Sequence, residues 1–137
     1  MRIVVDTSAL IAILLAEPER DAFLGALTDH EPVTSAGTLI GALRVVQVAV
    51  GAHLLDDVHA LLATHKVEVV PVDAAQVALA QDGMVRFGRG RGAGPAVLNF
   101  GDLFAYALAR HLDAPLLFKG ADFARTDVMP LVPPAGG

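Results

Sequence analysis

The chain has 137 residues, a formal net charge of −5 and no cysteine, and 54% of its residues are hydrophobic. This length suits one domain with a sizeable core, and the lack of cysteine excludes disulfides, a thiolate nucleophile and thiolate zinc sites. The acidic balance argues against a general basic coat for nucleic acid, and the high hydrophobic share predicts that some apolar surface is buried against a partner.

Short apolar strands alternate with helical segments along the chain. Strands are predicted at residues 3–5, 32–35, 67–72 and 115–118, with a fifth at 128–132. Helices are predicted at residues 9–16, from 17 through at least 27, and at 38–50, 54–65, 73–87 and 102–111. This order predicts an α/β fold with a central, mainly parallel sheet of four to five strands and helices on both faces. We expect a single domain over residues 1–132 and a frayed tail at 133–137.

Three aspartates stand where a predicted strand ends or a helix begins. Asp6 directly follows the first strand, Asp122 follows the fourth by a few residues, and Asp102 lies in the first turn of the helix before that strand. Ligands of open parallel sheets bind beyond the carboxyl ends of the strands, so all three side chains can reach one edge. Each aspartate alone could be a helix cap or a turn residue, but their joint placement favours a shared site. Oxygen ligands without cysteine or nearby histidine predict Mg²⁺ or Mn²⁺, and with it metal-dependent phosphodiester chemistry.

The glycine-rich segment at residues 88–94 lacks the complete pattern of a P-loop or a dinucleotide fingerprint. Arg89 and Arg91, with Arg86 nearby, could contact an RNA backbone. A flexible connector with solubilising charges is an equally weighted alternative.

Membrane association and export are not expected. No apolar run reaches the roughly 18 to 20 residues that cross a bilayer. Residues 1–6 carry one basic residue followed by an acid, which is not a signal-peptide pattern. We therefore expect a cytoplasmic protein.

Three segments together resemble the PIN-domain toxins of VapC type: residues 3–10, which read IVVDTSAL, residues 98–109 and residues 115–127. The match in order and spacing covers nearly the whole chain. The resemblance implies a three-layer α/β/α PIN-like domain and a Mg²⁺-dependent endoribonuclease toxin of a type II toxin–antitoxin system, neutralised by a VapB-like antitoxin. It also implies a homodimer and cleavage of structured RNA such as transfer or ribosomal RNA. Operator DNA would be bound only through the antitoxin.

By position, the resemblance assigns Asp6 and Asp102 as the principal metal ligands and catalytic residues, and Asp122 as a further acid of the site. The supporting positions it implies are Thr7 or Ser8 beside Asp6, Asn99 before Asp102, and, less securely, Asp127.

The chain departs from the family at Gly41. The family usually carries a glutamate there, in the helix after the second strand, and no acid occurs from Pro32 to Leu55 to replace it. Glycine inside a helix costs roughly 1 kcal/mol relative to alanine, so local propensity does not explain its presence. We expect reduced or absent nuclease activity, with the fold, the dimer and antitoxin binding retained.

Two alternatives remain open. The chain could be a catalytically silent PIN-fold binding module that acts through its antitoxin and operator DNA, with the apolar helices at 9–16, 23–27 and 39–50 as the partner surface. A structure-specific DNA nuclease or RNA-processing factor of the wider PIN group is less favoured, because the chain has no added substrate-binding domain.

Overall fold

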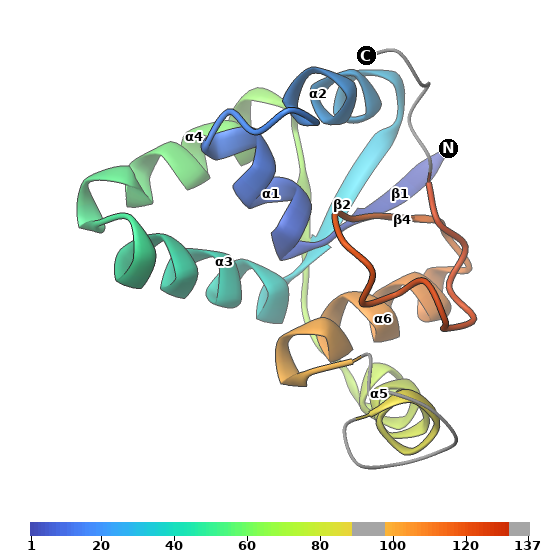
Figure 1. Cartoon of the computed structure of the whole chain (residues 1–137). Helices are drawn as coiled ribbons and strands as arrows, with labels where there is room; N and C mark the ends of the chain where they lie inside the picture. Colours follow the sequence, from blue (N-terminus) through green and yellow to red (C-terminus); the bar gives the residue numbers. More distant parts are fainter. Residues whose placement is uncertain (89–97, 132–137) are drawn as a thin grey trace.

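The central element of the fold is a parallel sheet (Figure 1). A computed structural model describes residues 1–88 and 98–131. Within them, four strands form the sheet: β1 (Arg2–Val5), β2 (Glu31–Ser35), β3 (Glu68–Val70) and β4 (Leu116–Leu117). Their order is β3-β2-β1-β4, and every neighbouring pair is parallel. The predicted parallel α/β architecture is confirmed.

Six α-helices connect or flank these strands in the described residues. They are α1 (Thr7–Leu14), α2 (Arg20–Asp29), α3 (Ala36–Ala49), α4 (Leu55–Thr64), α5 (Ala74–Phe87) and α6 (Phe100–Leu112), with a 3₁₀ turn η1 at Ala52–Leu54. Capping side chains fix where several of these helices begin. The Ser35 hydroxyl accepts the Gly37 N–H at 3.1 Å, so α3 begins two residues before the predicted position. None of the helices in the described residues is long and apolar enough to cross a bilayer.

The sheet separates two layers of helices. Ile3 and Val5 belong to a buried cluster with residues of α1, α2, α3 and α4. Val4 points to the opposite face and belongs to a second cluster, formed mainly with α6. Adjacent residues of a strand face opposite sides, so β1 contributes side chains to both halves of the core. Figure 1 shows α1 to α4 on one side of the sheet and α5 with α6 on the other.

The predicted fifth strand does not form in the described residues. The segment after Val128 meets β4 through a single bridge between Pro130 and Leu116. Leu116 donates to the Met129 carbonyl and accepts the Leu131 N–H, both at 2.8 Å, so the backbone nitrogen of Pro130 faces away from β4. Val132 and the predicted tail at 133–137 lie outside the described residues.

The predicted partner surface is also largely wrong, because the apolar side chains of α1 and α2 are mostly used inside the protein. Leu10 and Phe23, for example, are 2% and 4% exposed. By contrast, α3 leaves three apolar side chains on the surface: Ile40, Val45 and Val48.

A glycine in α5 allows α5 and α6 to pack closely. Gly83 of α5 faces the ring of Tyr106 on α6, and a Cβ at Gly83 would overlap that ring. Tyr106 is fully buried, and its hydroxyl donates to Asp127 at 2.7 Å, so the ring has little freedom to move away. The position of α6 therefore depends on a glycine in α5.

We predict opposite effects for two glycine-to-alanine changes. Gly83→Ala overpacks the α5–α6 contact and lowers the free energy of unfolding by about 1–3 kcal/mol. Gly25→Ala, in α2, has nothing within 4 Å of the added Cβ and raises the free energy of unfolding by about 0.5–1 kcal/mol through helix propensity. Urea unfolding curves measure both, and a stable Gly83→Ala variant would contradict the packing argument.

Candidate active site

Asp6, Asp102 and Asp122 line one cavity of about 940 Å³. Asp6 follows β1, and Asp122 lies in the chain that follows β4, the strand paired with β1. Asp102 lies in the first turn of α6, which packs against β1 and β2. The three aspartates that the sequence separates by up to 116 positions are thus brought to one edge of the sheet.

Asp6 is held by the residue two positions later. Its Oδ2 accepts the Ser8 N–H at 3.0 Å and the Ser8 hydroxyl at 2.7 Å. The Ser8 hydroxyl in turn accepts the Lys119 N–H at 2.9 Å, which ties the start of α1 to the chain after β4. The hydroxyl of Thr7 instead donates to the Thr38 carbonyl at 3.2 Å. Of the two proposed supports, Ser8 is the one that fixes the Asp6 carboxylate.

Asp102 is fixed by a capping box. Its Oδ2 accepts the Asn99 N–H at 3.0 Å, while the Asn99 side-chain oxygen accepts the Asp102 N–H at 2.9 Å. These reciprocal bonds satisfy two backbone donors that the helix start would otherwise leave free. Asn99 therefore orients the carboxyl group of Asp102, in keeping with the supporting role expected of it.

The carboxyl groups of the cavity disfavour one another's charge. Burial raises the pKa of Asp102 to about 7, and the nearby Asp6 and Asp122 carboxylates add to the rise. Burial also raises the pKa of Asp6, against the hydrogen bonds from Ser8 and with a smaller contribution from Asp122. A cation placed among these groups would favour their ionised forms.

The donor set fits a hard divalent cation in kind but not in arrangement. Carboxylate oxygens suit Mg²⁺ and Mn²⁺, and the described lining of the cavity contains no histidine. Yet within residues 1–88 and 98–131, no three carboxylate or imidazole groups are grouped closely enough to hold a metal ion as they stand.

Gly41 is also a residue of this cavity. It lines the same cavity from α3, where it contributes no donor atom of a side chain. A Cβ at this position would meet only the Thr7 hydroxyl, at 3.7 Å, which is ordinary van der Waals contact. The cavity therefore has room for a longer side chain from this helix.

The cavity also contains residues that the sequence reasoning missed. Lys119 lines it, and its ammonium lies 3.3 Å from Glu17 and 3.2 Å from Glu19. Arg44 and Phe100 line it as well. Lys119 could have been found from its place just after β4, by the same rule that pointed to Asp6 after β1.

Arg86 and Asp127 belong to a separate cluster between α5 and the C-terminal loop. The Arg86 guanidinium lies 3.0 Å from Asp82 and 3.2 Å from Asp127, and Arg110 joins both acids. Neither Arg86 nor Asp127 is among the residues that line the aspartate cavity. Arg89 and Arg91 lie outside the described residues.

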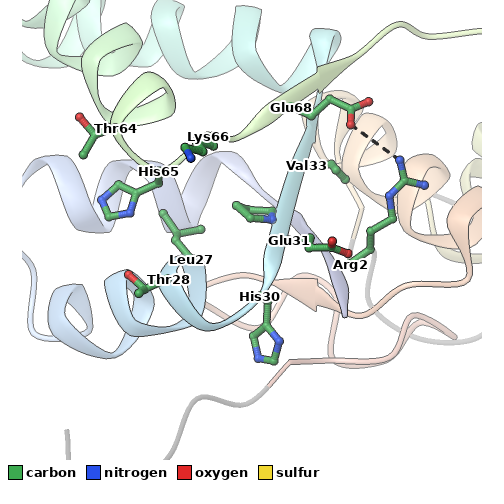
Figure 2. A pocket seen from close by; sticks show the side chains of 11 residues that line it. Arg2, Leu27, Thr28, His30, Glu31, Val33, Thr64, His65, Lys66 and Glu68 are labelled. Carbon is green, nitrogen blue, oxygen red and sulfur yellow. Dashed lines mark ion pairs between the residues drawn. The ribbon is translucent and has the colours of Figure 1, made fainter.

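A second hollow, of about 590 Å³, lies at the opposite end of the sheet (Figure 2). The first residues of three strands line it, and two of them, Arg2 and Glu68, form an ion pair at 3.8 Å. Figure 2 also shows His30 and His65 around this hollow. Ligands of parallel sheets gather at the carboxyl ends of the strands, so the aspartate cavity is the stronger candidate.

Comparison with known proteins matches residues 3–129 to the PIN domain. A ribonuclease VapC of Mycolicibacterium smegmatis is 40% identical over 127 residues, which cover 91% of this chain and 96% of that protein. Ribonuclease VapC30 of Mycobacterium tuberculosis is 36% identical over 126 residues, covering 91% and 95%.

Two solved structures share the fold at low sequence identity. VapC20 of Mycobacterium tuberculosis, a sarcin-ricin loop cleaving toxin, aligns with a TM-score of 0.75 at 18% identity, over 96% of this chain and 99% of that one. VapBC2 from Rickettsia felis, bound to a DNA fragment from its promoter, aligns with a TM-score of 0.75 at 13% identity, over 96% and 98%.

The raised pKa of Asp102 predicts a pH-dependent stability in the absence of divalent cations. Between the ordinary value of 3.8 and about 7, the folded protein keeps a proton that the unfolded chain loses. The free energy of unfolding therefore falls as the pH rises through this range and levels off above it. Asp102→Asn keeps the capping geometry but removes the titration.

Melting temperatures of the parent and of Asp102→Asn, measured with chelator from about pH 4 to pH 8, isolate this contribution. The stability of the parent relative to the variant should decline across the range. Parallel pH profiles for the two proteins would show that Asp102 titrates normally.

Proposed function

Because this chain belongs to the PIN-domain family of VapC ribonucleases, we propose that it cleaves RNA at the aspartate cavity as the toxin of a toxin–antitoxin pair. The observation that supports this most is the convergence of Asp6, Asp102 and Asp122 in one cavity. We further propose these three as the catalytic and metal-binding residues. The substrate is structured RNA of the transfer or ribosomal class.

Mg²⁺, or Mn²⁺ in its place, is the cofactor that this donor set favours. When bound, such a cation neutralises charge on a phosphodiester and lowers the pKa of a coordinated water. The protein's own residues hold the donors in position: Ser8 fixes Asp6, and the capping box with Asn99 fixes Asp102. Lys119, whose pKa is raised by Glu19 and Glu17, stays protonated, and its ammonium offsets the charge of those two acids beside the cavity.

Gly41 reduces the activity of this site. The helix that lines the cavity at this position supplies no carboxylate, and the described acids are not grouped as a complete metal site. Fewer carboxylate ligands mean weaker cation binding and less control over the attacking water. We therefore propose an enzyme that is attenuated by an incomplete ligand set rather than by a misfolded cavity.

Partners follow from the family. The fold is shared with VapBC2 from Rickettsia felis, whose structure contains promoter DNA. By this relationship we propose that a VapB-like antitoxin neutralises the chain, that the chain forms a homodimer, and that operator DNA is reached through the antitoxin. The exposed apolar residues of α3, Ile40, Val45 and Val48, supply a surface suited to such a partner.

Gly41 also supports a second candidate function. If the site without an acid at position 41 binds no cation at cellular concentrations, the chain acts only as a PIN-fold binding module, through the antitoxin and operator DNA. The two functions differ in one measurable property, which is cation-dependent RNA cleavage.

We predict that Gly41→Glu raises the rate of RNA cleavage in Mg²⁺ by roughly 10- to 100-fold, the range seen when a group supporting a metal site is lost or regained. A Cβ at Gly41 makes no close contact, and the position lines the cavity. Val48→Glu is the matched control, because it adds an acid to an exposed position of the same helix, away from the cavity lining. The assay uses transfer and ribosomal RNA, with Mg²⁺ and with chelator.

Cleavage should disappear with chelator and in Asp102→Asn, and Val48→Glu should behave as the parent. Equal and strong activity in the parent and in Gly41→Glu would contradict attenuation. Cleavage by Gly41→Glu but not by the parent would support the second function, in which the parent is a silent binding module.

A further inference from the structure

Phe100 is an exposed aromatic ring in the aspartate cavity. It is the first residue of α6, two positions before Asp102, and it is 76% exposed. It lines the cavity together with Asp6 and Asp102. The chain has only seven aromatic residues, so a ring left open beside the carboxylates is not a by-product of an aromatic-rich surface.

We propose that Phe100 is a stacking platform for an unpaired RNA base next to the phosphate that is cleaved. This subsite rests on the proposed function, because it names the part of the RNA that the same cavity receives. Aromatic side chains bind single-stranded RNA by stacking on bases that are not already stacked in a helix. The substrate class is therefore RNA with an unpaired nucleotide at the cleavage position.

The Phe100 ring is held in place by its neighbours. Phe104, one turn later in α6, meets it edge to face, with ring centroids 5.2 Å apart and an interplanar angle of 81°. Phe104 itself packs against α3 at Gly37, where a Cβ would overlap its ring. Gly37 thus allows Phe104 to approach α3, and Phe104 supports Phe100. A platform held in this way needs little ordering when a base binds.

Charges across the cavity match a nucleotide that enters beside Phe100. The sheet order places β1 between β4 and β2, so Asp6 lies between the chain that follows β4 and the helix that follows β2. Those flanking elements bring Lys119 and Arg44 to the lining. Arg44 suits a phosphate that flanks the cleaved bond, while Lys119 does so only when it leaves Glu17 and Glu19. The apolar ring of Phe100 then faces the base rather than the backbone.

A protein surface is the alternative occupant. Phe100 and Phe104 also line a neighbouring apolar groove of about 440 Å³ beside α5, which includes Val77 and Met84. A second copy of the chain seated there would cover Phe100 without any RNA. The base is favoured because Phe100 shares the cavity with the three aspartates, where the substrate must enter.

Phe100→Trp provides a direct test, because the chain has no tryptophan and the new residue would be its only indole fluorophore. The change is made together with Asp102→Asn, so that RNA binds without being cut. A short single-stranded RNA should quench the fluorescence on binding, and the same RNA annealed to its complement should not. Gln47→Trp, at an exposed position of α3 away from the cavity, is the matched control and should show no such quenching.

Binding of the same single-stranded RNA to Phe100→Ala, Phe100→Leu and Phe100→Trp, all with Asp102→Asn, separates stacking from apolar contact. The dissociation constant should rise roughly tenfold or more for both alanine and leucine and stay near the parent value for tryptophan, as loss of one base stack predicts. Thermal melting confirms that each variant is folded.

The proposal would be overturned if Phe100→Leu bound the single-stranded RNA as tightly as the protein that keeps Phe100. Equal quenching by single- and double-stranded RNA would overturn it too. Unchanged RNA affinity together with a change from dimer to monomer in Phe100→Ala would assign the ring to a second copy instead. These binding measurements are independent of catalysis. Absence of cleavage by the parent and by Gly41→Glu would contradict the proposed enzyme and leave the binding result to decide the subsite.

Discussion

The burial of acidic side chains beside one another at the edge of a parallel sheet is the constraint on which the rest of this structure depends. Asp6 and Asp102 are 4% and 8% exposed, and burial raises the pKa of both. Two features of the fold reduce this cost: Asp6 caps α1, and Asp102 completes the capping box of α6, so each carboxyl group accepts a backbone N–H. These hydrogen bonds do not neutralise the combined negative charge of the neighbouring carboxylates. The arrangement is best explained as a site made for a cation.

Glycines around the cavity have different roles, and the difference shows which one affects function. Gly37 and Gly83 face aromatic rings, Phe104 and Tyr106, that a Cβ would overlap, so they are required for α3 and α5 to approach α6. A Cβ at Gly41 would meet only one atom, at an ordinary van der Waals distance. Packing therefore does not require glycine at position 41. The absence of a side chain at Gly41 leaves α3 without a donor at this point of the cavity.

The sequence predicted the strands, their parallel pairing and the convergence of the aspartates, because apolar runs and helix caps are local and the rule for strand ends is general. It did not predict that a single bridge at Pro130 stands in place of a fifth strand within the described residues, since such pairing depends on tertiary contacts. It also misjudged α1 and α2: the nearly all-apolar α1 does not reveal which side chains reach the surface, and the apolar face of α2 is used in the core. Phe100 was missed because its exposure in the aspartate cavity depends on tertiary packing, whereas the place of Lys119 just after β4 was a usable signal.

The most direct test of a cation site that is incomplete at position 41 is to locate the cation. Crystals of the parent and of Gly41→Glu, soaked in Mn²⁺, would be compared by anomalous scattering. The account predicts a Mn²⁺ ion among Asp6, Asp102 and Asp122 in both, with higher occupancy and a fourth carboxylate ligand in Gly41→Glu. A Mn²⁺ ion bound elsewhere, or no ion at these aspartates even in Gly41→Glu, would contradict it.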